Sequence, residues 1–291
     1  MKGITLYTPA KINLSLDVTR RLPDGYHTLE TIMQSVSLYD IVTVEKRQSG
    51  IAVHCEHPYV PNDRRNIAYK AAEAFFSCCP EKGGAHISIR KNIPVSSGMA
   101  GGSTNAAGVL KGLNQLYGNV LSEARILELA RSLGADVAFC VEGGTQLARG
   151  IGDILTQLPD LVNVEVVLVK PPFPISTPWV YKQLDLNRLG ERPDTSGLIN
   201  AITEMDLQGI ASRMRNVLES VSVDKYPELR EIMDRFLEYG ALASRMSGSG
   251  PTIFGIFEES KKAEAAKEQF LKDYRDVFHV KTIGRGEQVE W

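Results

Sequence analysis

Residues 3–18 alternate between apolar and polar side chains, with Ile12, Leu14, Leu16 and Val18 on one face. Side chains in a strand point to opposite faces in turn, so this alternation predicts a half-buried β-strand. After the turn signal at 23–25, two more strand-like segments follow, at 26–36 and 41–46. The simplest arrangement of the three is an antiparallel meander.

Helical spacing of apolar residues comes next. The pattern predicts helices near 65–78, 104–117 and 122–134, with a strand at 85–91 between the first two. Ser122 is a good N-cap for the third helix and Gly134 a good stop signal. The segments 145–148 and 154–158 flank a glycine turn and predict a hairpin.

The second half starts with the apolar strand 162–171 and a proline-rich stretch. We expect a loop at 185–200, helices near 206–219, 227–239 and 260–273, and strands at 252–257 and 277–283. This order favours a small α+β sandwich. A division into domains 1–160 and 161–291 is predicted.

Charge and cysteine content narrow the range of possible functions. The 291 residues include 33 Lys and Arg against 35 Asp and Glu, a net charge of −2, which argues against a protein that binds nucleic acid or a membrane surface. The four cysteines lack the spacing of a disulfide framework or a metal clip, and the N-terminal segment lacks the features of a leader. We therefore expect a cytoplasmic protein.

His54, Cys55, Glu56 and His57 are the only metal-like cluster in the sequence. In a strand, His54 and His57 would point to opposite faces and would not bind one ion together. No metal site is predicted there.

Residues 94–106 place Gly98, Gly101 and Gly102 among hydroxyl side chains, between the strand at 85–91 and the helix at 104–117. Glycines let successive backbone N–H groups point inward, and the positive end of the helix favours an anion. A phosphate cradle is the prediction, and a simple turn between strand and helix is the alternative. The run matches neither a Walker loop nor the Gly-x-Gly-x-x-Gly fingerprint.

Three separated segments, PAKINLSL at 9–16, PVSSGMAGGSTNAA at 94–107 and SRMSGSGPT at 244–252, together resemble the GHMP kinase superfamily. Four shorter segments, at 9–14, 24–27, 133–137 and 216–219, resemble the 4-diphosphocytidyl-2-C-methyl-D-erythritol kinases within it. The resemblance implies a two-domain α+β GHMP kinase fold, with an N-terminal mixed β/α nucleotide-binding domain and a C-terminal ferredoxin-like α/β sandwich. It also implies ATP-dependent phosphorylation of the 2-hydroxyl of that substrate, in the non-mevalonate route to isoprenoid precursors.

By this resemblance Asp136 is the general base, and Lys11 is an electrostatic stabiliser that keeps Asp136 ionised. Spacing alone instead favours Asp136 as an N-cap for residues 137–141, and Lys11 as a solvated lysine on the polar face of its strand.

The resemblance implies that ATP and Mg²⁺ bind along the glycine run, with Asn66 and Lys91 near the adenine and ribose. Ser103 or Thr104 would ligate Mg²⁺ or a phosphate oxygen, although both positions also suit helix caps. The family often has Gly at Ala100 and Ser at Thr104, so the turn geometry is open. The assigned ATP-binding residues are Asn66, Lys91, Pro94, Ser97, Gly98, Met99, Ala100, Gly101, Gly102, Ser103 and Thr104.

The acceptor site implied by the resemblance contains Asn13, Tyr26, His27, Thr177 and Tyr181. Tyr26 would stack on cytosine, His27 would hydrogen-bond the base edge, and Tyr181 would close the opposite side. The expected partner is a small cytidine diphosphate substrate in the cleft between the domains, and the expected state is a monomer or weak homodimer.

Two alternatives remain. Another superfamily member, such as a homoserine or mevalonate kinase, would share the nucleotide half without the cytidine pocket. A non-catalytic nucleotide sensor would keep the cradle, but it would not need both Lys11 and Asp136.

Overall fold

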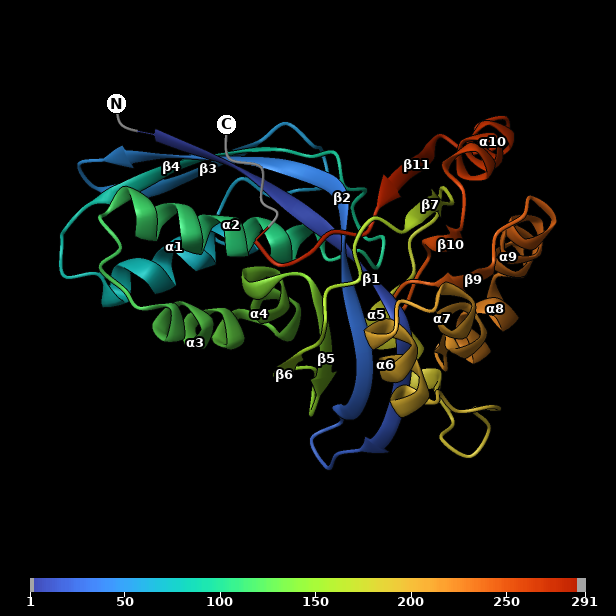
Figure 1. Cartoon of the computed structure of the whole chain (residues 1–291). Coiled ribbons are helices and arrows are strands. Elements are labelled where there is room, and N and C mark those ends of the chain that lie inside the picture. The colour runs from blue at the N-terminus through green and yellow to red at the C-terminus, as the bar shows by residue number, and fades with distance from the viewer. Residues whose placement is uncertain (1–2, 287–291) are drawn as a thin grey trace.

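The computed structural model describes residues 3–286 as two β-sheets with helices packed against them (Figure 1). The strands of the first sheet run in the order β3-β4-β2-β1-β8, while β5 pairs with β2 and with β6. Their bounds are β1 (Gly3–Arg21), β2 (His27–Arg47), β3 (Gly50–Cys55), β4 (Gly84–Arg90), β5 (Thr145–Arg149), β6 (Ile154–Gln157) and β8 (Arg215–Asn216).

The predicted strands at 26–36 and 41–46 are one continuous strand, β2, and the prediction of two segments was wrong. Asp40 suggested a break, but its carboxylate is fully buried and accepts hydrogen bonds from the backbone N–H groups of Asn92 and Ile93, at 2.7 and 2.8 Å. The predicted antiparallel meander therefore consists of β1 and β2 alone, because the next strand along the chain, β3, pairs in parallel with β4. The hairpin of β5 and β6 is confirmed.

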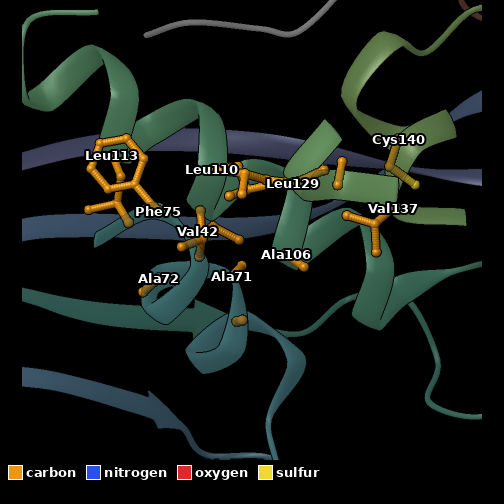
Figure 2. Packing of buried hydrophobic residues seen from close by; sticks show 14 of the residues in the cluster. Val42, Ala71, Ala72, Phe75, Ala106, Leu110, Leu113, Leu129, Val137 and Cys140 are labelled. Carbon is orange, nitrogen blue, oxygen red and sulfur yellow. The ribbon is translucent and has the colours of Figure 1, made fainter. Parts of the chain in front are cut away.

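Helices α1 (Ile67–Cys78), α2 (Gly101–Leu116) and α4 (Ala135–Glu142) pack against the first sheet, and α3 (Glu123–Leu133) packs on these three helices. Their apolar faces bury Phe75, Leu110 and Leu113 against Val42 of β2 (Figure 2). The caps of α3 at Ser122 and Gly134 are as predicted. Helix α2 begins earlier than predicted, because Gly101 and Gly102 form its first turn.

The second sheet is antiparallel, in the order β11-β7-β10-β9. Its strands are β7 (Glu165–Lys170), β9 (Ala243–Met246), β10 (Ile253–Phe257) and β11 (Asp276–Lys281). The helices of this half are α5 (Thr177–Gln183), α6 (Thr195–Thr203), α7 (Leu207–Arg213), α8 (Glu219–Lys225), α9 (Glu228–Glu238) and α10 (Ser260–Phe270).

Two predictions for this half were wrong. The expected loop at 185–200 contains the start of α6, whose N-cap Asp194 accepts a hydrogen bond from Gly197 N. The expected helix at 206–219 is divided into α7 and α8, because the chain extends at Met214 and β8 pairs in parallel with β1.

One hydrophobic cluster joins the two halves. It contains Ile12 of β1, Ile32 of β2, Leu168 of β7, Leu198 of α6 and Phe254 of β10. The sheets are therefore held at a fixed angle by shared packing. Within residues 3–286, no helix has both the length and the apolar character needed to cross a membrane.

Candidate active site

A cavity of about 430 Å³ lies where the two halves meet. Its walls come from β1, the first part of β2, the loop at 94–100, the starts of α2 and α4, helix α5 and the turn at 248–249. The assigned residues that line it are Lys11, Asn13, Asn66, Lys91, Pro94, Ser97, Gly98, Ala100, Gly101, Gly102, Ser103, Asp136, Thr177 and Tyr181. The structure brings these residues together from segments far apart in the sequence.

The glycine loop is shaped by left-handed backbone at Gly98 (φ 78°) and Ala100 (φ 58°). A Cβ on Gly98 would lie 2.3 Å from the carbonyl oxygen of Ser247, so only glycine fits there. Ala100 occupies the N-cap position of α2 without a side-chain hydrogen bond. The first turn of α2 therefore presents unpartnered N–H groups and a positive dipole end beside the cavity.

Ser103 and Thr104 are not helix caps, because α2 begins at Gly101. The Ser103 side chain lines the cavity. Thr104 is buried, and its Oγ1 has no hydrogen-bond partner among the described residues, although it lies beside the Cys140 thiol. Met99 is fully buried, and its carbonyl accepts a 3.2 Å hydrogen bond from Lys11 N, which ties the loop to β1.

Lys11 is held by a chain of hydrogen bonds on the polar face of β1. Its Nζ donates to Asn13 Oδ1 at 2.7 Å, and Asn13 Nδ2 donates to Thr31 Oγ1 at 2.8 Å. Lys11 is only 4% exposed, so the alternative of a solvated lysine was wrong.

Asp136 lies in the first turn of α4 and faces the cavity. The N-cap of α4 is Gly134, so the capping alternative for Asp136 was also wrong. No ion pair within 4.0 Å joins Asp136 to Lys11, both of which the structure describes. Both charges nevertheless act on the Cys140 thiol: burial and then the charge of Asp136 raise its pKa to about 12, and Lys11 opposes this rise. The carboxylate and the ammonium therefore face one region without neutralising each other directly.

Asn66 and Lys91 line the cavity and also have structural partners. Asn66 is the N-cap of α1 and accepts from Ala68 N at 2.9 Å. The Lys91 ammonium pairs with Asp40 and donates to Asn105 Oδ1 at 3.1 Å. A Cβ on Gly101 would lie 2.9 Å from Lys91 Nζ, so this buried pair lies directly beneath the glycine loop.

Tyr181 lines the cavity and forms an aromatic pair with His27, which does not line it. Their ring centroids are 5.3 Å apart and their planes are inclined by 36°. Burial, and then the nearby charge of Arg21, lowers the pKa of His27, so its imidazole is neutral at pH 7. Tyr26 is 65% exposed and does not line the cavity. Its assignment remains a prediction.

Thr177 lines the cavity and is within hydrogen-bond distance of Ser249, with 2.7 Å between their hydroxyl oxygens. The N-cap of α5 is Ser176, and Thr177 is the first residue of the helix.

Sequence reasoning missed Asn105 and Thr31, which line the cavity, and the buried Asp40, which pairs with Lys91 and accepts a hydrogen bond from Asn105. Asp40 interrupts an otherwise apolar pattern, and Asn105 lies among the apolar residues of α2. Such a buried polar residue signals an internal partner, but not which one. Across residues 3–286, no cluster of three His, Cys, Asp or Glu side chains could hold a metal ion.

Two domain models match the chain. The GHMP kinases N-terminal domain matches residues 66–144, and the GHMP kinases C-terminal domain matches residues 198–276. The first match includes the glycine loop and Asp136, and the second ends within β11.

Relatives cover nearly the whole chain. A 4-diphosphocytidyl-2-C-methyl-D-erythritol kinase from Acetivibrio thermocellus is 47% identical over 283 residues, which are 97% of this chain and 100% of that protein. Another protein of that name, from Syntrophomonas wolfei, is 47% identical over 277 residues, 95% of this chain and 97% of that protein. The chain belongs to the 4-diphosphocytidyl-2-C-methyl-D-erythritol kinase family. It is therefore a phosphotransferase that acts on a small molecule, and the family implies ATP as the donor.

Solved structures agree with this family. A crystal structure of 4-(cytidine 5'-diphospho)-2C-methyl-D-erythritol kinase has a TM-score of 0.83 and 33% identity, and the match covers 97% of this chain and 100% of that one. Homoserine kinase from Cytophaga hutchinsonii has a TM-score of 0.79 at 20% identity, with 99% and 98% covered, which shows the shared fold alone. The predicted two-domain GHMP kinase fold is confirmed for this member of the family.

Proposed function

We propose that this kinase transfers the γ-phosphoryl group of ATP to the 2-hydroxyl of 4-diphosphocytidyl-2-C-methyl-D-erythritol, in the non-mevalonate route to isoprenoid precursors. The observation that carries the proposal is one cavity lined by the glycine loop, Lys11, Asp136 and Tyr181. Tyr181 pairs with the ring of His27, which does not itself line the cavity. The names of the relatives at 47% identity support the choice of substrate.

Phosphoryl transfer requires positioning, neutralisation of charge and a group that accepts the hydroxyl proton. In our mechanism the acceptor oxygen bonds to the γ-phosphorus while the bond to the β,γ-bridging oxygen breaks. The hydroxyl proton passes to the Asp136 carboxylate, and ADP leaves. The Lys11 ammonium, fixed by Asn13, stabilises the negative charge that develops during transfer.

ATP would bind with its phosphates on the loop from Pro94 to Thr104. The left-handed backbone at Gly98 and Ala100 and the dipole of α2 support this assignment. Asn66 and Lys91 are assigned to the adenine and ribose end, and Lys91 would contribute there while still paired with Asp40.

Mg²⁺ would accompany the phosphates, as it does in kinases generally. The fit rests mainly on Ser103, which lines the cavity. Thr104 does not line it, but its buried Oγ1 has no hydrogen-bond partner among the described residues and lies one position further along the same helix turn. Hydroxyl oxygens are ligands of the kind that Mg²⁺ accepts, with phosphate and water completing its shell. When bound, the ion supplies charge neutralisation.

The acceptor would lie between Asn13, Thr177 and the aromatic pair. A neutral imidazole has one donor nitrogen and one acceptor nitrogen, which suits the mixed edge of cytosine. Tyr181 is positioned to pack against the base, and Tyr26, although exposed, follows the turn beside it.

The deciding experiment measures ADP release by the purified full chain with Mg²⁺ and ATP. The cytidylyl methylerythritol compound, homoserine and mevalonate are supplied side by side, with a control lacking any acceptor. We expect turnover with the first compound alone. Turnover with homoserine or mevalonate instead would overturn the proposed substrate, and ATP binding without turnover on any acceptor would favour the nucleotide sensor.

A further inference from the structure

The turn at 247–250, in the second half of the chain, packs directly on the glycine loop of the first half. Ser247 Oγ donates to Gly98 O at 3.0 Å, and Thr252 N donates to Ser97 O at 3.3 Å. Gly248 and Ser249 form part of the cavity wall. A shift of this turn would therefore change the shape of the cavity beside the phosphate loop.

Asn216 holds this turn through both protons of its side-chain amide. Its Nδ2 donates to the carbonyls of Met246 at 2.7 Å and Gly248 at 2.8 Å, and its Oδ1 accepts from Leu218 N at 3.0 Å. The residue is 5% exposed, so water does not replace these bonds easily. Only a primary amide offers two donors and an acceptor in this compact form.

The same residue is fixed to the strand that carries Lys11. Strand β8 pairs in parallel with β1 at Ser15 and Leu16, and Val217 N donates to Leu16 O at 3.0 Å. A Cβ on Gly248 would lie 3.6 Å from Lys11 Nζ and 3.5 Å from Asn13 Oδ1. Asn216 therefore links the lysine strand to the turn that covers the lysine.

Glu219 holds Met246 from its other side. Its Oε1 accepts from Met246 N at 2.8 Å, so the N–H and the C=O of one residue are both bound by the segment 216–219. Strand β9 is the edge of the second sheet and β8 lies at the end of the first. These two hydrogen bonds, from Asn216 and Glu219 to Met246, form a clamp that joins the edges of the two sheets beside the site.

The hydrogen bond from Asn216 Nδ2 to Gly248 O sets the orientation of the Gly248–Ser249 peptide. In a trans peptide the C=O and the next N–H point in opposite directions. Because Gly248 O is drawn toward Asn216, the Ser249 N–H points away from Asn216. Within residues 3–286 this N–H has no acceptor, and Ser249 lines the cavity.

We infer that Asn216 is a positioning residue for phosphoryl transfer: it sets the Gly248 turn so that Ser249 N–H donates to a phosphate oxygen opposite the glycine loop. The inference rests on the proposed function. Its ligand is a phosphate group, which either ATP or the diphosphate of the acceptor could supply.

The test replaces Asn216 with aspartate, which keeps the acceptor for Leu218 N but lacks both donors. We expect kcat to fall about 10- to 100-fold, somewhat less than for outright loss of a transition-state donor, while KM for ATP changes less than about threefold. The matched control is Asn200→Asp on α6, the same chemical change at an exposed residue, which should leave kcat unchanged. Equal kcat for wild type and N216D would overturn the inference.

A direct readout uses the backbone amide signal of Ser249 in ¹⁵N-labelled protein. In the wild type it should shift when a non-hydrolysable ATP analogue or CDP is added, and the probe that causes the larger shift identifies the source of the phosphate. The shift should be reduced in N216D. No shift with either probe in the wild type would also overturn the inference.

This measurement separates the two proposals, because it needs no turnover. If the cytidylyl compound is not phosphorylated but the Ser249 amide responds to the ATP analogue, the proposed substrate fails while the role of Asn216 stands. If N216D does not fold, Asn216→Thr, which keeps one hydroxyl donor, replaces it.

Discussion

Asp136 is the side chain on which the proposed chemistry depends most directly. It is not used as a helix cap, it faces the cavity, and it has no ion pair with Lys11 within 4.0 Å. A carboxylate placed in this way can accept a proton from a bound alcohol. Lys11, by contrast, is fixed by Asn13, and in the proposed mechanism it acts through its charge.

Replacing Asp136 with asparagine keeps the shape and removes the base. We expect kcat for ADP release to fall by about 10²- to 10⁴-fold, with little change in ATP affinity. Asp234→Asn on the exposed face of α9 is the matched control and should behave as wild type. Turnover near the wild-type rate in D136N would refute the assignment.

The side chain of Glu165 on β7 links this strand to β11. Its carboxylate accepts from His279 Nε2 at 2.7 Å and pairs with Lys281 Nζ at 3.0 Å. Burial alone would raise the pKa of Glu165, but the hydrogen bonds from Lys281 and His279 prevail and lower it below 4.5. A lowered folded-state pKa contributes stability above pH 4.5 that is lost as the pH falls through the folded-state value.

Glu165→Gln should therefore be less stable than wild type at pH 7, and the difference should shrink as the pH falls below 4.5. Urea unfolding from pH 7 to pH 3 measures both free energies. Glu268→Gln on α10, an exposed site without an ion-pair partner among the described residues, should show no such pH-dependent gap. A gap that stays constant down to pH 3 would contradict this account.

Among the elements, the glycine loop combines backbone strain with close approach. Gly98→Ala would place a methyl group at φ 78° and 2.3 Å from Ser247 O. Left-handed backbone costs about 1–2 kcal/mol and overpacking about 1–3 kcal/mol, so we expect a loss of about 2–5 kcal/mol in unfolding free energy.

Gly102→Ala is the matched control from the same loop. Its φ is not positive, and the nearest atom to an added Cβ is 3.6 Å away, so stability should be unchanged or about 0.5–1 kcal/mol higher. Thermal unfolding of both variants measures the difference. Equal melting temperatures for the two would show that the approach of Ser247 does not constrain the loop.

The sequence predicted correctly those elements that residues close together in the chain determine. The alternation of β1, the caps of α3 and the hairpin of β5 and β6 were all read from neighbouring residues. The continuity of β2 was missed because Asp40 is satisfied by Asn92, Ile93, Lys91 and Asn105, 51 to 65 positions away. The two-residue strand β8 was missed because only its partner on β1 defines it.

The residues of the candidate site also differ in whether local sequence signals or long-range contacts define them. The glycine loop carries its own signature, but that single segment left a phosphate cradle and a simple turn as alternatives, and the other two motifs were needed to favour the cradle. The assignments of Lys11 and Asp136 depended on resemblance, because spacing alone favoured a solvated lysine and a cap. The clamp of Asn216 and Glu219 on Met246 depends on contacts across about 30 positions, which no periodicity reveals.

At the scale of the whole molecule, the two halves share one core. Side chains of β1 and β2 pack with those of β7, β10 and α6 in one cluster, and β8 adds a strand from the second half to the first sheet. The domain boundary between residues 160 and 161 stays a prediction. We propose that the two parts unfold together as one cooperative unit. A cavity built at their junction then keeps its shape through common packing.

A fragment of residues 1–160 tests this proposal. Alone it would expose Ile12, Ile32 and Val36, which the second half covers in the whole chain. Uncovering such a surface removes about 25 cal/mol of stabilisation per Å² of apolar area, so we expect the fragment to lack a cooperative thermal transition. Mixing it with residues 161–291 should restore the transition and part of the kinase activity. A fragment that alone gives dispersed amide signals and a sharp transition would contradict the proposal, because its core would then be complete without the second sheet.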